Sequence, residues 1–321
     1  MNDVNLVDAR ILVTGGHGFL GSRLRAQLAS LGCKHVLTPR SAELDLLERD
    51  RVRGYLAEHK PDVVFHLAAR VGGIGANQAA PAQLFTDNAT MGLFVVDECW
   101  RANVGKLVAV ATVCAYPKFT PSPFSEDALW DGYPEETNAP YGLAKKMMLV
   151  QAQAYRAQYG FHGVVLFPAN LYGPRDNFDL QTSHVVPAMI RKIDAAKARG
   201  DDTVTLWGDG TPTRELLYVD DCARALALAA EKYDDAAPVN IGTGVDISIK
   251  ELAARIASLL EWSGRIVWDA SKPNGQPKRR LDVTRAKERF GFTAAIALDG
   301  GLARTVDWWQ REGRTHVDGR R

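Results

Sequence analysis

The stretch that decides the fold is ILVTGGHGFLG, residues 11–21. Its first three residues are apolar, as in a buried strand, and three glycines follow before a helical pattern begins. Glycines permit a tight turn and a close approach of backbone to a pyrophosphate, whose charge the start of a helix stabilises. We therefore predict a dinucleotide site formed by Gly15, Gly18, Phe19, Leu20 and Gly21. The alternative is a tight strand-to-helix turn without a ligand.

The first half of the chain alternates short β-branched runs with longer helical patterns. Expected strands cover residues 10–14, 35–37, 63–67, 106–111 and 163–168, and expected helices cover residues 21–31, 50–59, 91–102 and 141–159. Repeated strand–helix–strand units indicate a parallel sheet covered by helices. The predicted fold class is α/β, a doubly wound parallel (Rossmann) sheet with a smaller C-terminal α/β substrate lobe.

The alternation of strands and helices ends after residues 172–174, Tyr-Gly-Pro, where a polar stretch begins. We predict a nucleotide-binding Rossmann domain over residues 1–175, to which residues 214–243 return through a strand near 238–241. The smaller lobe then consists mainly of residues 176–213 and 244–321.

Composition excludes several classes of protein. The 321 residues are 46% hydrophobic, and 39 Lys and Arg balance 38 Asp and Glu, so no global field favours nucleic acid or a membrane surface. The N-terminus lacks a secretory pattern and no apolar run is long enough to span a bilayer. Four cysteines lack metal-site spacing and are expected to be reduced thiols. We expect a soluble, cytoplasmic protein with no metal.

The residues after the second expected strand indicate which nicotinamide nucleotide fits. Thr38-Pro39-Arg40-Ser41 supplies Arg40 and no acid until Glu43, which favours the 2′-phosphate of NADP; NAD is the alternative, with Arg40 an ordinary surface residue. Asp45 and Leu46 lie where a loop would cover the adenine. The small residues after the third strand let the centre of the cofactor lie against backbone: Leu67, Ala68 and Ala69.

Tyr141 and Lys145 are four residues apart in an expected helix, so they share one helix face. A cation beside a phenol stabilises phenolate, which lets the tyrosine exchange a proton with a substrate oxygen. A surface helix matches this spacing by chance as well, so the pair needs support from elsewhere.

Thr112 and Cys114 follow the strand expected over residues 106–111, at the sheet edge that faces ligands. Thr112 can bind a substrate oxygen and complete a Thr-Tyr-Lys set. The Cys114 thiol can remove a proton from a carbon beside a ketone, and His184 is a candidate to return one on the opposite face. The alternatives are a buried cysteine and a histidine that caps a helix or lies on the surface. Spacing does not decide whether they meet.

These motifs resemble the extended short-chain dehydrogenase/reductase superfamily, and within it the family of GDP-L-fucose synthases, over nearly the whole chain. The resemblance rests on residues 69–74, 114–118, 136–141 with Lys145, 170–174 with 176–178, 183–188, 207–215 and 269–275. It implies an NADPH-dependent enzyme that converts GDP-4-keto-6-deoxy-D-mannose to GDP-L-fucose.

The resemblance also implies roles. Cys114 and His184 invert the carbons beside the ketone, and Tyr141 protonates the ketone oxygen while Lys145 lowers its pKa and holds the nicotinamide ribose. Further cofactor contacts are Pro168, Asn170 and Leu171. Substrate contacts are Asn170, His184, Val185, Arg191, Trp207, Arg214, Lys278 and Arg279, with Arg280 in the same basic run. Superfamily members form homodimers, so a homodimer is expected.

Three departures from the family pattern leave alternatives open. Thr112 stands where the family commonly has serine, His17 stands near a position that is often arginine, and the loop 126–134 differs from that of the best-known synthases. Another GDP-4-keto sugar, such as a 6-deoxy-heptose or a dideoxy sugar, would suit such a loop. A 4-epimerase, or a reductase without epimerisation, would have no role for Cys114. A non-catalytic dinucleotide sensor would have no role for Tyr141. A dehydratase would need carboxylates directly after Thr112, where this chain has none.

Overall fold

Six parallel strands form the main sheet of the computed structural model, which describes residues 4–272 and 274–315. Their order is β2-β1-β3-β4-β5-β9. The bounds are β1 Arg10–Thr14, β2 His35–Leu37, β3 Val63–His66, β4 Lys106–Val110, β5 Gly163–Pro168 and β9 Val239–Ile241. Ile11 pairs with Val36 on one side and Val63 on the other, so the order reverses at β1. The predicted doubly wound Rossmann sheet is confirmed.

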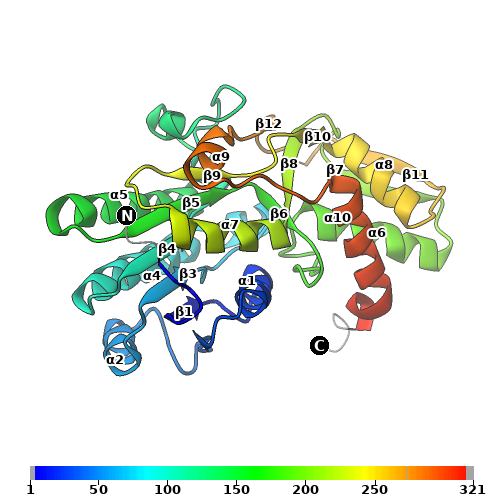
Figure 1. The fold of residues 1–321 in the computed structure, drawn as a ribbon. Helices are drawn as coiled ribbons and strands as arrows, with labels where there is room; N and C mark the ends of the chain where they lie inside the picture. Colours follow the sequence, from blue (N-terminus) through cyan, green and yellow to red (C-terminus); the bar gives the residue numbers. More distant parts are fainter. Residues whose placement is uncertain (1–3, 273, 316–321) are drawn as a thin grey trace.

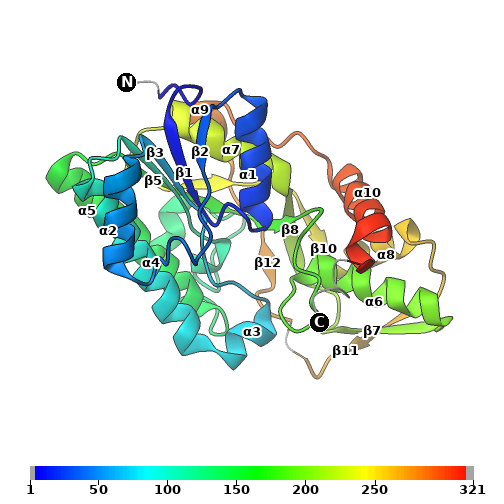
Figure 2. The same ribbon diagram turned by 90° about the horizontal axis from the view of Figure 1, so that it is seen from below.

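Helices cover both faces of this sheet (Figures 1 and 2). One face carries α1 Phe19–Ser30 and α7 Val219–Lys232, and the other carries α2 Arg49–His59, α4 Pro81–Arg101 and α5 Ala139–Tyr159. Because both faces are covered, β3 is buried at every residue, as parallel sheets require. The short α3, Ile74–Ala79, lies between β3 and α4.

The start of α4 differs most from the helices predicted in the first half of the chain. The sequence pattern placed the start of α4 at Met91, but the helix begins at Pro81. Proline suits the first turn, since its missing N–H has no partner there anyway. Ala80 provides no capping side chain, which is why the boundary carried no sequence signal.

The smaller lobe is built from two small sheets and three helices, α6, α8 and α10, which gather at one end of the molecule (Figure 1). β6 Asn170–Tyr172, β8 Thr213–Tyr218, β10 Asp246–Ser248 and β12 Lys278–Arg279 form one sheet, and β7 Thr203–Trp207 pairs with β11 Arg265–Asp269. The helices are α6 Val185–Arg199, α8 Ile249–Leu259 and α10 Leu298–Trp308, followed by a π-helical turn at Trp309–Gly313.

Two clusters of buried apolar side chains correspond to the two halves. The larger surrounds the six-stranded sheet, and the smaller fills the space among α6, α8 and α10. Leu281, Phe290 and Phe292 also pack into the larger cluster. The chain therefore returns to the main sheet a further time, through α9, Thr284–Phe290, and the sequence did not indicate this return. The domain boundaries at 175, 214 and 243 remain predictions, since packing does not define an independently folding unit.

The long connection between β4 and α5 is tied down by Asn240 of β9. The Tyr116 hydroxyl donates to Asn240 Oδ1 at 2.7 Å, and Asn240 Nδ2 donates to the Phe124 carbonyl at 2.9 Å. Two 3₁₀ turns lie in this connection, η1 Val113–Ala115 and η2 Glu126–Trp130. The residues that follow β4 are therefore held in place by the sheet. Among the described residues, no helix is long and apolar enough to cross a membrane.

Candidate active site

The carboxyl ends of β1, β3, β4 and β5 open into one cavity of about 1380 Å³, which reaches from the main sheet to the smaller lobe. Ligands of open α/β sheets bind at this edge. Every residue predicted to contact the cofactor lines the cavity: Gly15, Gly18, Phe19, Leu20, Gly21, Arg40, Asp45, Leu46, Leu67, Ala68, Ala69, Tyr141, Lys145, Pro168, Asn170 and Leu171. Their placement agrees with the prediction, and their contacts with a nucleotide remain predictions.

The turn between β1 and α1 has the geometry that a pyrophosphate needs. Gly15 has a φ of +72°, and the Gly18 amide donates to the Gly15 carbonyl at 2.9 Å. A β-carbon at Gly21 would lie 2.1 Å from that same carbonyl, so only glycine lets the helix start this close. Since no side chain caps α1, its first amides are free to bind an anion. The residues present therefore fit a dinucleotide.

Arg40 and Ser41 line the far end of the same cavity, after β2. The Glu43 carboxylate accepts a hydrogen bond from the Arg40 amide at 2.8 Å. His17 bonds the Thr38 carbonyl through Nε2 at 2.9 Å. The Arg40 side chain is exposed at the cavity wall. A cation at this position suits a 2′-phosphate, as predicted.

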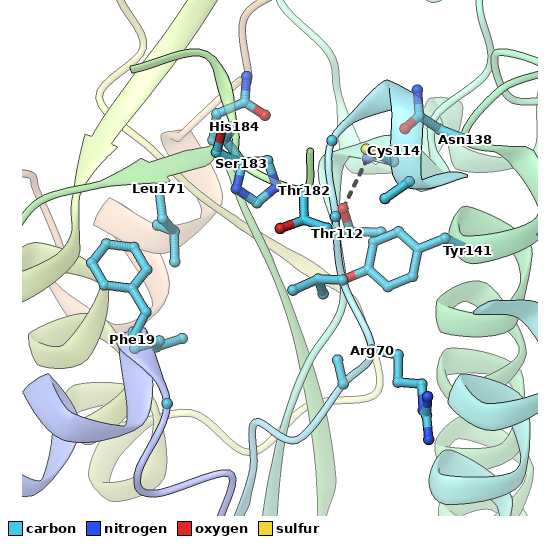
Figure 3. Close-up of a pocket in the computed structure, with 18 of the residues that line it drawn as sticks. Phe19, Arg70, Thr112, Cys114, Asn138, Tyr141, Leu171, Thr182, Ser183 and His184 are labelled. Atoms are coloured by element: carbon cyan, nitrogen blue, oxygen red, sulfur yellow. Dashed lines mark hydrogen bonds between the residues drawn. The ribbon is translucent and has the colours of Figure 1, made fainter. Parts of the chain in front are cut away.

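Thr112 and Tyr141 form the centre of the cavity wall (Figure 3). Thr112 Oγ1 accepts a hydrogen bond from the Cys114 amide at 3.2 Å. Burial raises the pKa of the Tyr141 phenol, the charge of Cys114 adds to this, and the nearby Thr112 hydroxyl opposes it. Burial therefore dominates the pKa of this phenol, and the lowering effect expected of Lys145 stays a prediction. The phenol keeps its proton at neutral pH, as a proton donor must.

Lys145 lies one turn further along α5 and is 2% exposed. Burial lowers the pKa of its ammonium to about 8. Within the part of the chain that the structure describes, no carboxylate pairs with it. A buried ammonium on the wall of a cavity suits the hydroxyls of a ribose, which would supply the acceptors that it lacks.

His66 is a neighbour of Lys145 that the sequence did not indicate. It is fully buried on β3, and its Nδ1 bonds the Thr14 hydroxyl at 2.9 Å. Burial, with a smaller effect of the Lys145 charge, lowers the pKa of His66 to about 3. The ring is therefore neutral and adds no second positive charge beneath the cavity.

Cys114 and His184 lie on facing walls of the cavity, Cys114 on η1 and His184 directly before α6 (Figure 3). The Cys114 sulfur is 3.5 Å from a terminal nitrogen of Arg279. Burial, and then the charge of Arg279, lower the pKa of His184. The tertiary fold therefore answers the question that spacing left open, since the two side chains share one cavity.

Two arginines meet where the smaller lobe closes the cavity. Arg279 of β12 is opposite Arg214 of β8, and each is 8% exposed. Arg214 donates to the carbonyls of Gln276 at 2.7 Å and Asn274 at 3.2 Å, and burial, with Arg279, lowers its pKa to about 9. Two adjacent cations in a buried place favour an anionic ligand.

Most residues predicted to bind substrate also line the cavity, namely Asn170, His184, Val185, Trp207, Arg214 and Arg279. Trp207 is 49% exposed at the opening, and the Lys192 and Lys272 ammonium groups lie 5.9 and 5.8 Å from its ring centre. A flat aromatic ring with this exposure is suited to stack on a nucleotide base.

Two predicted substrate contacts, Arg191 and Lys278, do not line the cavity. Arg191 donates to the Phe178 carbonyl at 2.8 Å, and the next residue on α6, Lys192, lines the cavity instead. Lys278 is 49% exposed beside Asp246, and Arg280 also lies near Asp246, whereas Arg279 between them faces inward. Successive residues of a strand point to opposite faces, so a basic run supplies one residue to one side.

Two segments of the cavity wall, at Gly73 and at residues 182–183, contact each other in a way that the sequence did not indicate. The Gly73 amide donates to the Thr182 carbonyl at 3.0 Å, and a β-carbon at Gly73 would lie 2.5 Å from the Ser183 carbonyl. Both segments belong to motifs that carried the resemblance, but nothing in the sequence showed that they touch. Arg70, Asn138, Lys192, Asn274 and Gln276 also line the cavity. Pro273, in the motif 269–275, lies outside the described residues.

A Thr-Tyr-Lys set beside a glycine turn for a pyrophosphate defines a dinucleotide-dependent oxidoreductase. Comparison with known proteins gives the family: residues 11–242 match the model of the NAD dependent epimerase/dehydratase family, and the chain belongs to this family.

Similar proteins share nearly the full length. The GDP-L-fucose synthase of Sinorhizobium fredii is 41% identical over 298 residues, 93% of this chain and 94% of that protein. A crystal structure of a GDP-L-fucose synthetase from Naegleria fowleri bound to NADP has a TM-score of 0.88 at 26% identity and covers 97% of each chain. A GDP-6-OMe-4-keto-L-xylo-heptose reductase from C. jejuni has a TM-score of 0.89 at 26% identity, over 95% of this chain and 98% of that one.

Proposed function

We propose that this protein converts GDP-4-keto-6-deoxy-D-mannose to GDP-L-fucose by 3,5-epimerisation and NADPH-dependent reduction of the 4-keto group. The observation that carries the proposal is that Cys114 and His184 face each other across the cavity that also contains Thr112 and Tyr141. A simple reductase or 4-epimerase needs Thr112 and Tyr141 but has no use for Cys114 and His184. The names of full-length relatives support the same assignment.

The residues divide the reaction between two walls. Cys114 takes a proton from a carbon beside the ketone, and His184 delivers one to the opposite face, which inverts that carbon. During both inversions, the hydroxyls of Thr112 and Tyr141, which line the same cavity, face the ketone oxygen and stabilise its developing negative charge. Repeating these transfers on the other side of the ketone gives the second inversion.

Reduction uses the groups around Tyr141. NADPH, when bound, supplies the hydride that reduces the ketone carbon. Tyr141 donates its proton to the ketone oxygen, and Lys145 holds the ribose hydroxyls and compensates the charge that the phenol acquires. Gly15, Gly18 and Gly21 would hold the pyrophosphate of the cofactor, and Arg40 its 2′-phosphate.

The substrate's nucleotide belongs at the smaller lobe. Arg214 is suited to its diphosphate, and Trp207 with Lys192 to its base. These assignments bring charge-assisted bonds to the phosphates and leave the sugar ring between Cys114 and His184.

Incubation with GDP-4-keto-6-deoxy-mannose and NADPH in deuterated water tests the proposal. We expect oxidation of NADPH, deuterium at both carbons beside the former ketone, and GDP-L-fucose as the product identified by NMR. Absence of both NADPH oxidation and deuterium incorporation would reject the function.

A second candidate is reduction of a GDP-4-keto-heptose without inversion. The similarity to the C. jejuni reductase favours it. Such an enzyme would oxidise NADPH with a 4-keto-heptose substrate and leave no deuterium in the product.

The predicted homodimer belongs to the same proposal. α4 and α5 pack side by side and present apolar side chains outward, with Leu93, Met147 and Val150 40%, 37% and 49% exposed. A second copy that packs its own α4 and α5 against this face would cover them. Light scattering should give the mass of a dimer, and Val150→Glu should give a monomer; a monomeric wild type would contradict this. The cytoplasmic location stays a prediction.

A further inference from the structure

We propose that Gln276 is a positioning residue that holds the Arg279 guanidinium against the Cys114 sulfur, so that Arg279 serves the epimerisation centre. The inference rests on the proposed function and deepens it. It gives Arg279 a task beside the reacting carbon, where the family resemblance had implied contact with the substrate.

The Gln276 side chain is 2% exposed, and both ends of its amide are bonded. Its Nε2 donates to the carbonyls of Pro117 and Lys118 at 3.1 and 2.9 Å, and its Oε1 accepts from Arg279 Nε at 2.8 Å. Because two carbonyls can only accept, the nitrogen must face them and the oxygen must face the guanidinium. The amide therefore has one orientation, set by the segment that directly follows Cys114.

The fixed amide determines where Arg279 points. With Nε bound to Gln276, a terminal nitrogen reaches the Cys114 sulfur at 3.5 Å. The same charge acts on His184 across the cavity, since it contributes to the lowered pKa of that ring. Arg279 thus contacts one of the two proposed epimerisation residues and acts electrostatically on the other.

Arg214 is held differently, which separates the tasks of the two arginines. It donates to main-chain carbonyls, including that of Gln276, and makes no hydrogen bond to the Gln276 side chain in the described structure. A change of the Gln276 side chain therefore releases Arg279 and leaves the bonds of Arg214 to the main chain in place.

The chemistry gives this placement a purpose. The Cys114 thiolate takes the proton from the carbon beside the ketone, and the electron pair of that C–H bond becomes the enolate. His184 then gives a proton to the opposite face, and the electron pair returns to carbon. Exchange with solvent resets both groups. Arg279 exchanges no proton; its positive charge pairs with the sulfur while the sulfur is negative.

Gln276→Met tests the proposal, because it keeps the length of the side chain and removes the donor and the acceptor. We expect the rate at which iodoacetamide alkylates Cys114, measured by peptide mass mapping near neutral pH without nucleotide sugar, to fall about tenfold. Deuterium exchange beside the ketone should fall by about ten- to a hundredfold, with the KM for the GDP-sugar unchanged within about twofold.

Two controls match this variant. Cys33 is part-buried and does not line the cavity, so its alkylation rate should be the same in every variant. Lys278→Met changes the neighbour of Arg279 that points away from the cavity, and should alter neither alkylation of Cys114 nor deuterium exchange.

Arg279→Lys provides a second variant in case Gln276→Met does not fold, which thermal unfolding by circular dichroism would reveal. A lysine keeps the charge but cannot reach both Gln276 and the sulfur, so alkylation and exchange should again fall. If folded variants keep both rates, or if only the KM for the GDP-sugar rises, the proposal is overturned. The alkylation assay needs no substrate. If the wild type turned over no GDP-sugar, the proposed function would be refuted, and the alkylation rates would still test whether Gln276 positions Arg279 at Cys114.

Discussion

The carbonyl oxygen of Cys114 lies so close to Gly142 that a β-carbon on Gly142 would be 2.4 Å away from it. The first turn of α5 therefore rests directly on the turn that carries Cys114. This contact sets the Tyr141 phenol against Thr112, because Tyr141 immediately precedes the glycine. A residue without a side chain thus joins the redox groups to the epimerisation groups.

Gly142→Ala should reduce both activities together. The added methyl must push α5 away from backbone, so we expect about 1–3 kcal/mol of destabilisation and at least about a tenfold loss of NADPH oxidation and deuterium exchange. Urea unfolding and the two assays measure these effects. Gly54→Ala, in α2 with open space at the β-carbon, is the control and should be neutral or stabilising. Unequal loss of the two activities would argue against a shared contact.

Tyr141→Phe should abolish reduction while NADPH still binds. The variant keeps the ring and removes the proton, so a loss of about a hundredfold or more in NADPH oxidation is expected, with the dissociation constant of NADPH, from fluorescence titration, nearly unchanged. Thr112→Ser keeps a hydroxyl in the cavity wall and should retain most activity, whereas Thr112→Ala should not. Substantial turnover by Tyr141→Phe would exclude it as the proton donor.

Lys145→Met should stabilise the protein while it impairs reduction. Burial lowers the pKa of Lys145 from 10.5 to about 8, which corresponds to roughly 3 kcal/mol spent on keeping the ammonium charged at neutral pH. Since the folded chain binds fewer protons than the unfolded chain between these two values, wild-type stability rises with pH across that window. The advantage of the variant in urea unfolding should therefore be largest near pH 7 and shrink toward pH 10. A variant less stable than wild type at pH 7 would contradict the assignment.

Arg40→Ala should weaken NADPH without affecting NADH. Removing one charge-assisted contact to a 2′-phosphate should cost about ten- to a hundredfold in the kcat/KM for NADPH. The exposed position of Arg40 means that folding should be unaffected. Arg51→Ala, on the exposed surface of α2, provides the matched loss of charge. Equal losses with both nucleotides would remove Arg40 from 2′-phosphate recognition.

The main sheet and one wall of the site were predictable because local patterns determine them. The glycines at 15, 18 and 21 indicate the turn, and residues that follow parallel strands must meet at the same edge, which placed Thr112 and Cys114 correctly. Periodicity also gave β1, β2 and β5 with their observed bounds.

The other wall depended on details that the sequence does not carry. A rotation of the helix by one residue decides whether Arg191 or Lys192 faces the cavity. A shift of the strand register by one residue decides whether Lys278 or Arg279 faces it. Gln276 carried no signal at all, since its partners at 117 and 118 are far away in the chain. The raised pKa of Tyr141 likewise follows from burial, which spacing alone cannot report.

The two chemistries differ in how much of the smaller lobe they use. Thr112, Tyr141 and Lys145 come from α5 and the turn after β4, which also carries Cys114, whereas His184 and Arg279 come from segments of the smaller lobe. During divergence, a lineage could therefore alter the smaller lobe and lose inversion while it inherits an intact reductase. One scaffold would then give rise to enzymes that differ in the handedness of the sugar they release.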